Sequence, residues 1–264
     1  MNRIWIGLAV LTLGAGAAKA QEEDLIGSKK APSILPKAVK AVMKKEGFRF
    51  LQKISITGLD DRKADFRGET RNRKAFAAAT GSAEVYAKGL RYLVRSGENF
   101  FPPDKLKGEE GTRAAMFRNP AVLLLDIRKL SRGATWGDDE TVDGKACIVA
   151  KLSADERTVK AQIKGFNTYL GELKQYGVSD ITPYIDVKRS TSRYLVSVGK
   201  EDLLIHRIEW VVSLAVKKNA IPPGVPITLP EKVEAKMEMK MSGYDEELQL
   251  DLPKKIRQWS GIKG

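Results

Sequence analysis

The residue types that most often perform catalysis or bind metals are scarce in this chain. His206 is the single histidine and Cys147 the single cysteine among 264 residues. One histidine excludes a zinc site built from several histidines and the HExxH motif of metalloproteases. His206, Ile208 and Trp210 occupy every second position of a predicted strand and so share one of its faces. We therefore interpret His206 as a hydrogen-bonded core or rim residue. Cys147 lies in the apolar run ACIVA, which favours a buried, unreactive thiol.

Three further patterns have the residue types of a chemical site without its spacing. The acidic segment at 137–144, GDDETVDG, could hold calcium, but its spacing is not that of an EF-hand loop, and a solvated hairpin is favoured. The DGK at 143–145 lacks the upstream glycines of a phosphate-binding loop. Paired carboxylates such as Glu246 and Glu247 occur only in predicted turns, and no nucleophile elbow is present. We therefore predict that the chain is not an enzyme and uses no cofactor and no metal.

A methionine stripe near the C-terminus is the most unusual pattern. Met237, Met239 and Met241 occupy every second position, with charged residues between them. A period of two predicts a strand with one apolar and one charged face. Methionine is flexible and polarizable, so it suits surfaces that accept apolar groups of variable shape, although a filled core is the alternative. The charged face carries Glu234, Lys236, Glu238 and Lys240.

Strands of this kind make up most of the chain. Short alternating runs joined by short turns extend from Phe48 to residue 101, and again between 145 and 242. Such runs favour antiparallel pairing. Helices are predicted at 33–47, 120–130 and 154–175. The alternation of helices with groups of strands predicts an α+β fold with a large, curved antiparallel sheet.

Two of the predicted helices have features that bear on function. The helix at 33–47 is amphipathic, with Pro36 in its first turn. The helix at 120–130 starts at Asn119, a favoured N-cap, and its apolar residues cover more than half of its circumference. A helix of that kind must be covered on two sides or face a cavity. Its apolar residues are Val122, Leu123, Leu124, Leu125, Ile127 and Leu130.

The first 20 residues have the composition of an export signal. Arg3 precedes an apolar stretch, and the AKA ending at Ala20 fits a cleavage site before Gln21. Because glutamine and not cysteine follows the site, we expect no lipidated cysteine. The sequence therefore predicts a protein of the bacterial periplasm, or one outside the cell, with a flexible lead-in at 21–32 and a single domain at 33–264.

The charge of the chain bears on its partners. The formal net charge is +13, which favours acidic partners. Lysine and arginine are scattered rather than clustered with aromatic residues, and export also argues against nucleic acid. An anionic membrane surface fits better, while a merely solvated surface is the alternative. We expect a monomer.

The order of these motifs resembles the LolA-like family, which includes periplasmic lipoprotein carriers and LppX-type lipid-binding proteins. The resemblance spans about residues 33–257 and is carried by VDGKACIVAKL, LLIHRIEW and SGYDEELQLDLPKK. It implies an open half-barrel whose concave face is covered by helices, with acyl chains bound between sheet and helices. No residue of this chain matches the arginine that anchors the lid in the carriers.

The resemblance implies a function and a set of residues. The chain would be a periplasmic carrier or binder of acyl chains, from an outer-membrane lipoprotein or a lipid, with the helix at 120–130 as a lid. The alternative is an envelope protein-interaction module with a filled core and no lipid cargo. The residues expected to line the cavity are Phe48, Phe50, Ile54, Leu123, Leu124, Ile127, Tyr194, Val196, Ile208, Trp210, Met237, Met239 and Met241.

Overall fold

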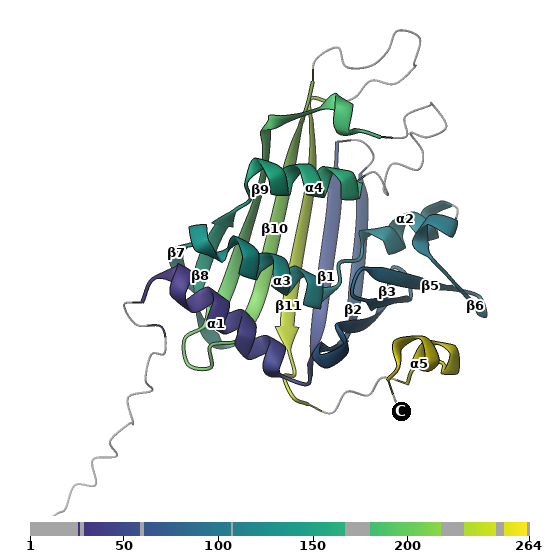
Figure 1. The fold of residues 1–264 in the computed structure, drawn as a ribbon, viewed down its shortest axis with the longest axis horizontal. Helices are drawn as coiled ribbons and strands as arrows, with labels where there is room; N and C mark the ends of the chain where they lie inside the picture. The colour runs from purple at the N-terminus through teal and green to yellow at the C-terminus, as the bar shows by residue number, and fades with distance from the viewer. Residues whose placement is uncertain are drawn as a thin grey trace, which may run out of the picture.

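The computed structural model describes residues 26, 29–58, 61–106, 108–166, 180–217, 230–246 and 251–262, with backbone alone for 164–166. The predicted export signal and the end of the third predicted helix, at 167–175, lie outside these ranges. The described residues form one large antiparallel sheet, open at both ends and curved, with helices packed on it (Figure 1). The predicted α+β class is therefore confirmed.

Two meanders build the sheet. Within the described residues its order is β6-β5-β4-β3-β2-β1-β11-β10-β9-β8-β7. The first six strands follow one another along one half, and the last five along the other half. The final strand returns to pair with the first, so that the two halves join at the centre. The strands are β1 (Gly47–Thr57), β2 (Arg62–Arg71), β3 (Phe76–Gly81), β4 (Val85–Lys88), β5 (Arg91–Ser96), β6 (Asn99–Phe101), β7 (Thr135–Val142), β8 (Lys145–Ser153), β9 (Ile185–Gly199), β10 (Ile205–Val216) and β11 (Lys232–Ser242).

Three helices cross one face of the sheet, which we call the inner face (Figure 1). They are α1 (Ala31–Lys44), α3 (Pro120–Leu130) and α4 (Glu156–Phe166). The helix α2 (Gly108–Met116) contacts β2 near one end of the sheet. Short 3-10 turns connect several elements: η1 (Asn72–Lys74), η2 (Pro103–Lys105), η3 (Ser131–Gly133) and η6 (Thr182–Tyr184).

The last helix, α5 (Lys254–Ser260), covers the opposite face, which we call the outer face. Residues of β3 alternate between two apolar clusters, because Ala77 and Ala79 join the main core whereas Phe76 and Ala78 join a second one. Successive side chains of a strand point to opposite faces. The second cluster contains Ile256 of α5, so this helix packs on the outer face of the first meander.

The strand β11 divides its residues between the two faces as predicted. Its methionine stripe is at most 2% exposed, whereas the charged residues between the methionines lie on the outer face. Met237 pairs with Ile54 on one side and with Trp210 on the other. The stripe therefore occupies the centre of the inner face, where the two meanders meet.

The helix α1 begins two residues earlier than predicted. Pro32 and not Pro36 lies in its first turn, and Pro36 is inside the helix. Ile26 is 1% exposed and belongs to the main core. The backbone carbonyl of Lys29 accepts a hydrogen bond from the indole N–H of Trp136 at 2.7 Å. The described part of the predicted lead-in is thus packed against the fold.

In the ranges that the structure describes, no helix combines the length and the apolar character needed to cross a membrane.

The assignment of faces on β11 predicts unequal effects of two neighbouring substitutions. Met239→Asp should reduce the free energy of unfolding by more than about 3 kcal/mol, because it places a carboxylate at a position with no exposed surface. Glu238→Ala should change it by less than about 0.5 kcal/mol, as is typical of surface positions. Urea unfolding followed by circular dichroism measures both changes. Equal losses would show that the faces of this strand are wrongly assigned.

Candidate functional site

The residues predicted to line a cavity all lie together on the inner face or on the helix above it. Each is at most 7% exposed, and all belong to the main apolar cluster. The sheet residues come from β1, β11, β10 and β9, which are adjacent strands in the middle of the sheet, one from the first meander and three from the second. Leu123, Leu124 and Ile127 come from α3. These residues therefore belong to one continuous apolar surface, and their role in ligand binding stays a prediction.

The high apolar content of α3 is explained by contacts on two sides. The helix packs on the sheet, where it contacts β3 and β8, and it also lies beside α1. Leu124 and Ile127 have no exposed surface, whereas Val122 and Leu125 are partly exposed. Of the two possibilities that the sequence left open, the helix is thus covered on two sides.

A polar residue that the sequence analysis did not single out holds the chain just before α3. Gln52 is fully buried on the inner face, between the apolar positions Phe50 and Ile54. Its side-chain N–H donates to the carbonyl of Arg118 at 3.0 Å, and its side-chain oxygen accepts from the Arg118 N–H at 3.0 Å. This reciprocal pair ties the connection between α2 and α3 to β1. A lone amide in an apolar alternation was the signal that could have revealed it.

Asn119 anchors the start of α3 a second time. Its side-chain oxygen accepts from the Ala121 N–H at 3.1 Å, which confirms the predicted N-cap. Its side-chain N–H group also donates to the carbonyls of Ala75 and Gly89, both at 3.1 Å. These two carbonyls flank the pairing of β3 with β4. The N-terminal end of α3 is therefore fixed to the first meander at the start of β3 and the end of β4.

Polar atoms on the inner face are grouped around Trp210. The Arg118 guanidinium lies 5.6 Å from the centre of the Trp210 ring, a cation–π distance. Trp210 stacks on Tyr194 with the ring centres 6.2 Å apart, and its indole N–H donates to the Ser192 hydroxyl at 3.0 Å. Gln162 of α4 donates to the Tyr194 hydroxyl at 2.9 Å. Burial raises the pKa of Tyr194, which stays neutral.

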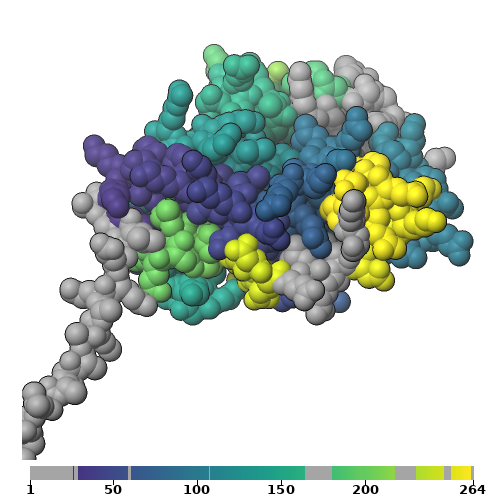
Figure 2. All heavy atoms as spheres, turned by 60° about the horizontal axis from the view of Figure 1, so that its bottom comes forward, coloured from purple at the N-terminus to yellow at the C-terminus, as the bar shows by residue number. Residues whose placement is uncertain are grey.

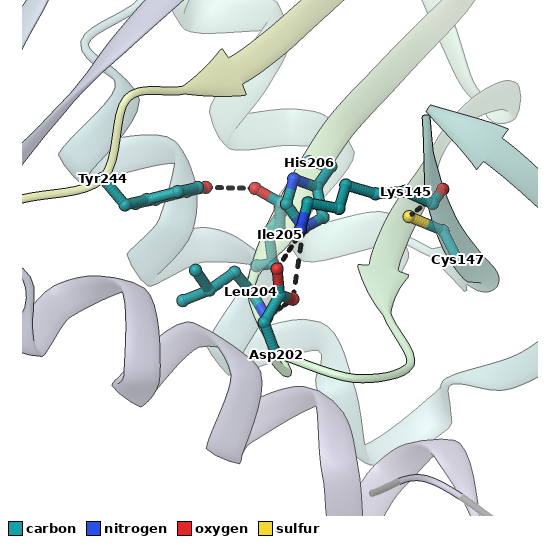
Figure 3. A network of polar contacts seen from close by, with 7 residues as sticks. All are labelled: Lys145, Cys147, Asp202, Leu204, Ile205, His206 and Tyr244. Carbon is teal, nitrogen blue, oxygen red and sulfur yellow. Dashed lines mark hydrogen bonds and ion pairs between the residues drawn. The ribbon is translucent and has the colours of Figure 1, made fainter. Parts of the chain in front are cut away.

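His206 belongs to a structural network at one end of the sheet (Figure 3). Its Nε2 lies 3.0 and 3.2 Å from the two carboxylate oxygens of Asp202, which also accepts from the Leu204 N–H at 2.9 Å. The Tyr244 hydroxyl donates to the carbonyl of Ile205. The prediction of a hydrogen-bonded residue is confirmed. A register shift between Ile205 and Arg207 leaves His206 at a bulge, so the regular alternation assumed from sequence does not hold there.

Cys147 has no features of a nucleophile. Its thiol is buried and donates to the carbonyl of Lys145 at 3.5 Å (Figure 3). Burial, with the nearby carboxylates of Glu140 and Asp202, raises the pKa of the Cys147 thiol to about 11. Little reactive thiolate is present at neutral pH. Among the residues that the structure describes, no group of three or more His, Cys, Asp or Glu is placed to hold a metal ion.

Two grooves open on the outer face, and each has charged as well as apolar residues in its lining. One, of about 540 Å³, lies near the start of the segment that leads to α5 and is lined by Arg49, Arg67, Glu69, Glu84 and Asp251 among others. The second, of about 480 Å³, has Lys53, Lys63, Lys236, Asp65, Glu209 and Glu238 in its lining. Charged groups in a groove that is open to water suit an apolar chain less well than the continuous apolar inner face does. The inner face remains the better candidate for an apolar ligand.

Comparison with known proteins yields structural matches. No protein-family model and no curated protein matches the sequence. The lipoprotein LppX from Mycobacterium tuberculosis is 9% identical, with 84% of this chain and 98% of that chain covered and a TM-score of 0.43. LprF from Mycobacterium bovis is 10% identical, with coverage of 84% and 96% and a TM-score of 0.45. A LolA superfamily protein from Nitrosomonas europaea is 14% identical, with coverage of 86% and 96% and a TM-score of 0.29. LppX and a LolA superfamily protein, the two groups that the sequence resemblance named, are therefore among these structures.

The Gln52 anchor should be visible in stability measurements. Gln52→Leu removes both hydrogen bonds to Arg118 and leaves a main-chain N–H and carbonyl without their partner, which should cost about 2–3 kcal/mol. Leu51→Gln is the matched control, because Leu51 is 55% exposed on the outer face, and it should change stability by less than about 0.5 kcal/mol. Urea unfolding tests both, and hydrogen exchange should show faster opening of α3 in Gln52→Leu alone. A Gln52→Leu protein as stable as the control would contradict the anchor.

The raised pKa of Cys147 has a defined pH dependence. As pH rises, the unfolded thiol ionises first, near its ordinary value of about 8.5, while the folded thiol keeps its proton up to about pH 11. The folded state therefore binds more protons in this window, so stability should fall with rising pH between those values. Cys147→Ala should lack this component of the decline in urea-unfolding curves. Rapid reaction of the native thiol with a thiol reagent near neutral pH would contradict its burial.

Proposed function

We propose that this chain is an exported, periplasmic carrier or binder of acyl chains that acts as a monomer without cofactor or covalent chemistry. The supporting observation is the inner face, a continuous apolar surface with a methionine stripe at its centre, covered by helices rather than by a second sheet. The cargo would be the acyl chains of an outer-membrane lipoprotein or of a free lipid.

Burial of an acyl chain on this surface has enough free energy for useful affinity. Each methylene removed from water contributes about 0.8 kcal/mol. Ten methylenes would contribute roughly 8 kcal/mol, which corresponds to a dissociation constant near 1 μM before the costs of ordering the chain are subtracted. A non-covalent mechanism is therefore sufficient for binding and still allows release.

Entry of a chain requires movement of the helices, because the lining residues are buried by α3 and its neighbours. The start of α3 is held by Gln52 and Asn119, whereas its other end continues into η3, which contacts α1 and β8. We propose that α3 pivots about Asn119 and that its apolar side chains are replaced by the cargo. The methionine stripe suits this exchange, because methionine side chains repack readily around different shapes.

One observation favours a second candidate function. The inner face is already filled by side chains, with Leu124, Val196 and Met239 at 0% exposure. An envelope protein-interaction module with a permanently filled core would have the same property. The two functions differ in whether an acyl chain can reach Trp210.

Quenching of tryptophan fluorescence by a brominated fatty acid tests this directly, since bromine quenches only nearby indoles. The mature chain contains Trp136, Trp210 and Trp259. In a variant with Trp136→Phe and Trp259→Phe, Trp210 on the inner face should be quenched saturably by dibromostearic acid and not by stearic acid. In a variant with Trp136→Phe and Trp210→Phe, the fluorescence of Trp259 should not be quenched, because Trp259 packs against the second apolar cluster, on the outer face.

The alternatives give different results. Equal quenching of Trp210 and Trp259 would indicate nonspecific association. Absence of any quenching or co-purified lipid, in protein with a folded circular dichroism spectrum, would exclude the carrier and leave the filled-core module. Native mass spectrometry of the protein from its own host would detect co-purified lipid.

A further inference from the structure

The solvent side of the helices that cover the inner face is basic. On α1, Lys37, Lys40 and Lys44 are exposed, and the helix contains no acidic residue. The end of α3 and the following turn η3 add three more exposed cations. We call this set the lid surface: Lys37, Lys40, Lys44, Arg128, Lys129 and Arg132.

The acidic groups closest to the lid surface along the chain already have basic partners. Asp126 lies 3.1 Å from Lys129. Beyond the end of α1, Glu46 is 3.1 Å from Arg73, and Asp245 is 2.7 Å from Lys45. These carboxylates therefore neutralise one cation each and leave the lysines of α1 as a net positive surface.

The outer face of the sheet has a different pattern. Its charges alternate in sign and form ladders, for example Lys236 with Glu234 at 3.1 Å and Lys240 with Asp143 at 2.9 Å. Arg207 contacts two carboxylates, those of Glu140 and Glu209. The lid surface therefore carries a stronger net positive charge than the centre of the outer face does.

The composition of the lid surface favours a lipid partner over a protein partner. Protein interfaces are enriched in aromatic residues and depleted in lysine. Half of the lid surface is the lysine row of α1, and the exposed large apolar residues of the described chain, Leu51, Leu90 and Phe101, lie elsewhere. Figure 2 shows α1, in purple, as an open stretch of surface separate from α5, in yellow.

We propose that the lid surface docks on an anionic lipid bilayer. The apolar side of α1 is buried in the core, so the contact would be electrostatic and peripheral rather than an insertion of the helix. Docking by this side would place α3 against the membrane, the direction from which an acyl chain would arrive. That last consequence depends on the proposed function, whereas the docking itself does not.

Vesicle flotation tests the docking with the mature chain. The protein should bind vesicles that contain phosphatidylglycerol and not vesicles of phosphatidylcholine alone, and added salt should release it. The variant Lys37→Gln, Lys40→Gln, Lys44→Gln should bind more weakly by on the order of a hundredfold, since each lysine near an anionic surface contributes about fivefold. The matched control, Lys53→Gln, Lys63→Gln, Arg67→Gln, removes the same charge from exposed positions of the outer face and should change binding by less than about threefold.

Thermal unfolding of both variants checks that their folds are intact. Equal weakening by the two sets would overturn the proposal, because total charge and not the lid surface would then control binding. Failure of the wild-type protein to bind anionic vesicles would also overturn it and would point to an acidic protein as the occupant.

Quenching of Trp210 by dibromostearic acid without vesicles separates this inference from the proposed function. The α1 triple variant should retain that quenching, since its substitutions lie outside the inner face. Quenching without vesicle binding would overturn the docking proposal and leave the carrier proposal standing. Vesicle binding without quenching would support the docking proposal and overturn the proposed carrier function.

Discussion

An open sheet with one apolar face cannot leave that face in water, and the rest of the structure follows from this constraint. The pairing of β1 with β11 joins two meanders into one surface, so the apolar residues of both halves become continuous. Closure into a barrel would have covered this surface with the sheet itself. Because the sheet stays open, α1, α3 and α4 must cover it, and their apolar sides are buried against it.

Covering a sheet with helices creates a second requirement, because the chain between the helices also becomes buried. Main-chain N–H and carbonyl groups in such a connection need hydrogen-bond partners. Gln52 supplies both partners for Arg118, and Asn119 caps α3 while reaching the carbonyls of Ala75 and Gly89. The few polar side chains on the apolar surface are thus a consequence of how that surface is covered, and they also decide which end of α3 is fixed.

The periodic features of the chain were predictable, and features that depend on distant partners were not. The methionine stripe and the alternation in β1 revealed the inner face because a strand has only two sides. Gln52 was overlooked because its partner lies 66 residues away. The second apolar cluster could not be predicted from the sequence. The strand β3 has the sequence FAAATG and is apolar on both faces, so the alternation of its residues does not show which face is the inner one. At His206, a local bulge breaks the alternation on which the parity argument relied.

The helix α3 combines the two physical properties on which the proposals depend. Its inward residues share a cluster with the methionine stripe, and the cations at its end lie in water next to the lysine row of α1. Apolar burial holds it on the sheet, and this term is insensitive to salt. Attraction of its basic end to a charged surface acts from outside and falls steeply with ionic strength. Gln52 and Asn119 hold the N-terminal end of α3. A surface that attracts the C-terminal end would apply its force where, among the described residues, side-chain hydrogen bonds stay within the helix and its following turn.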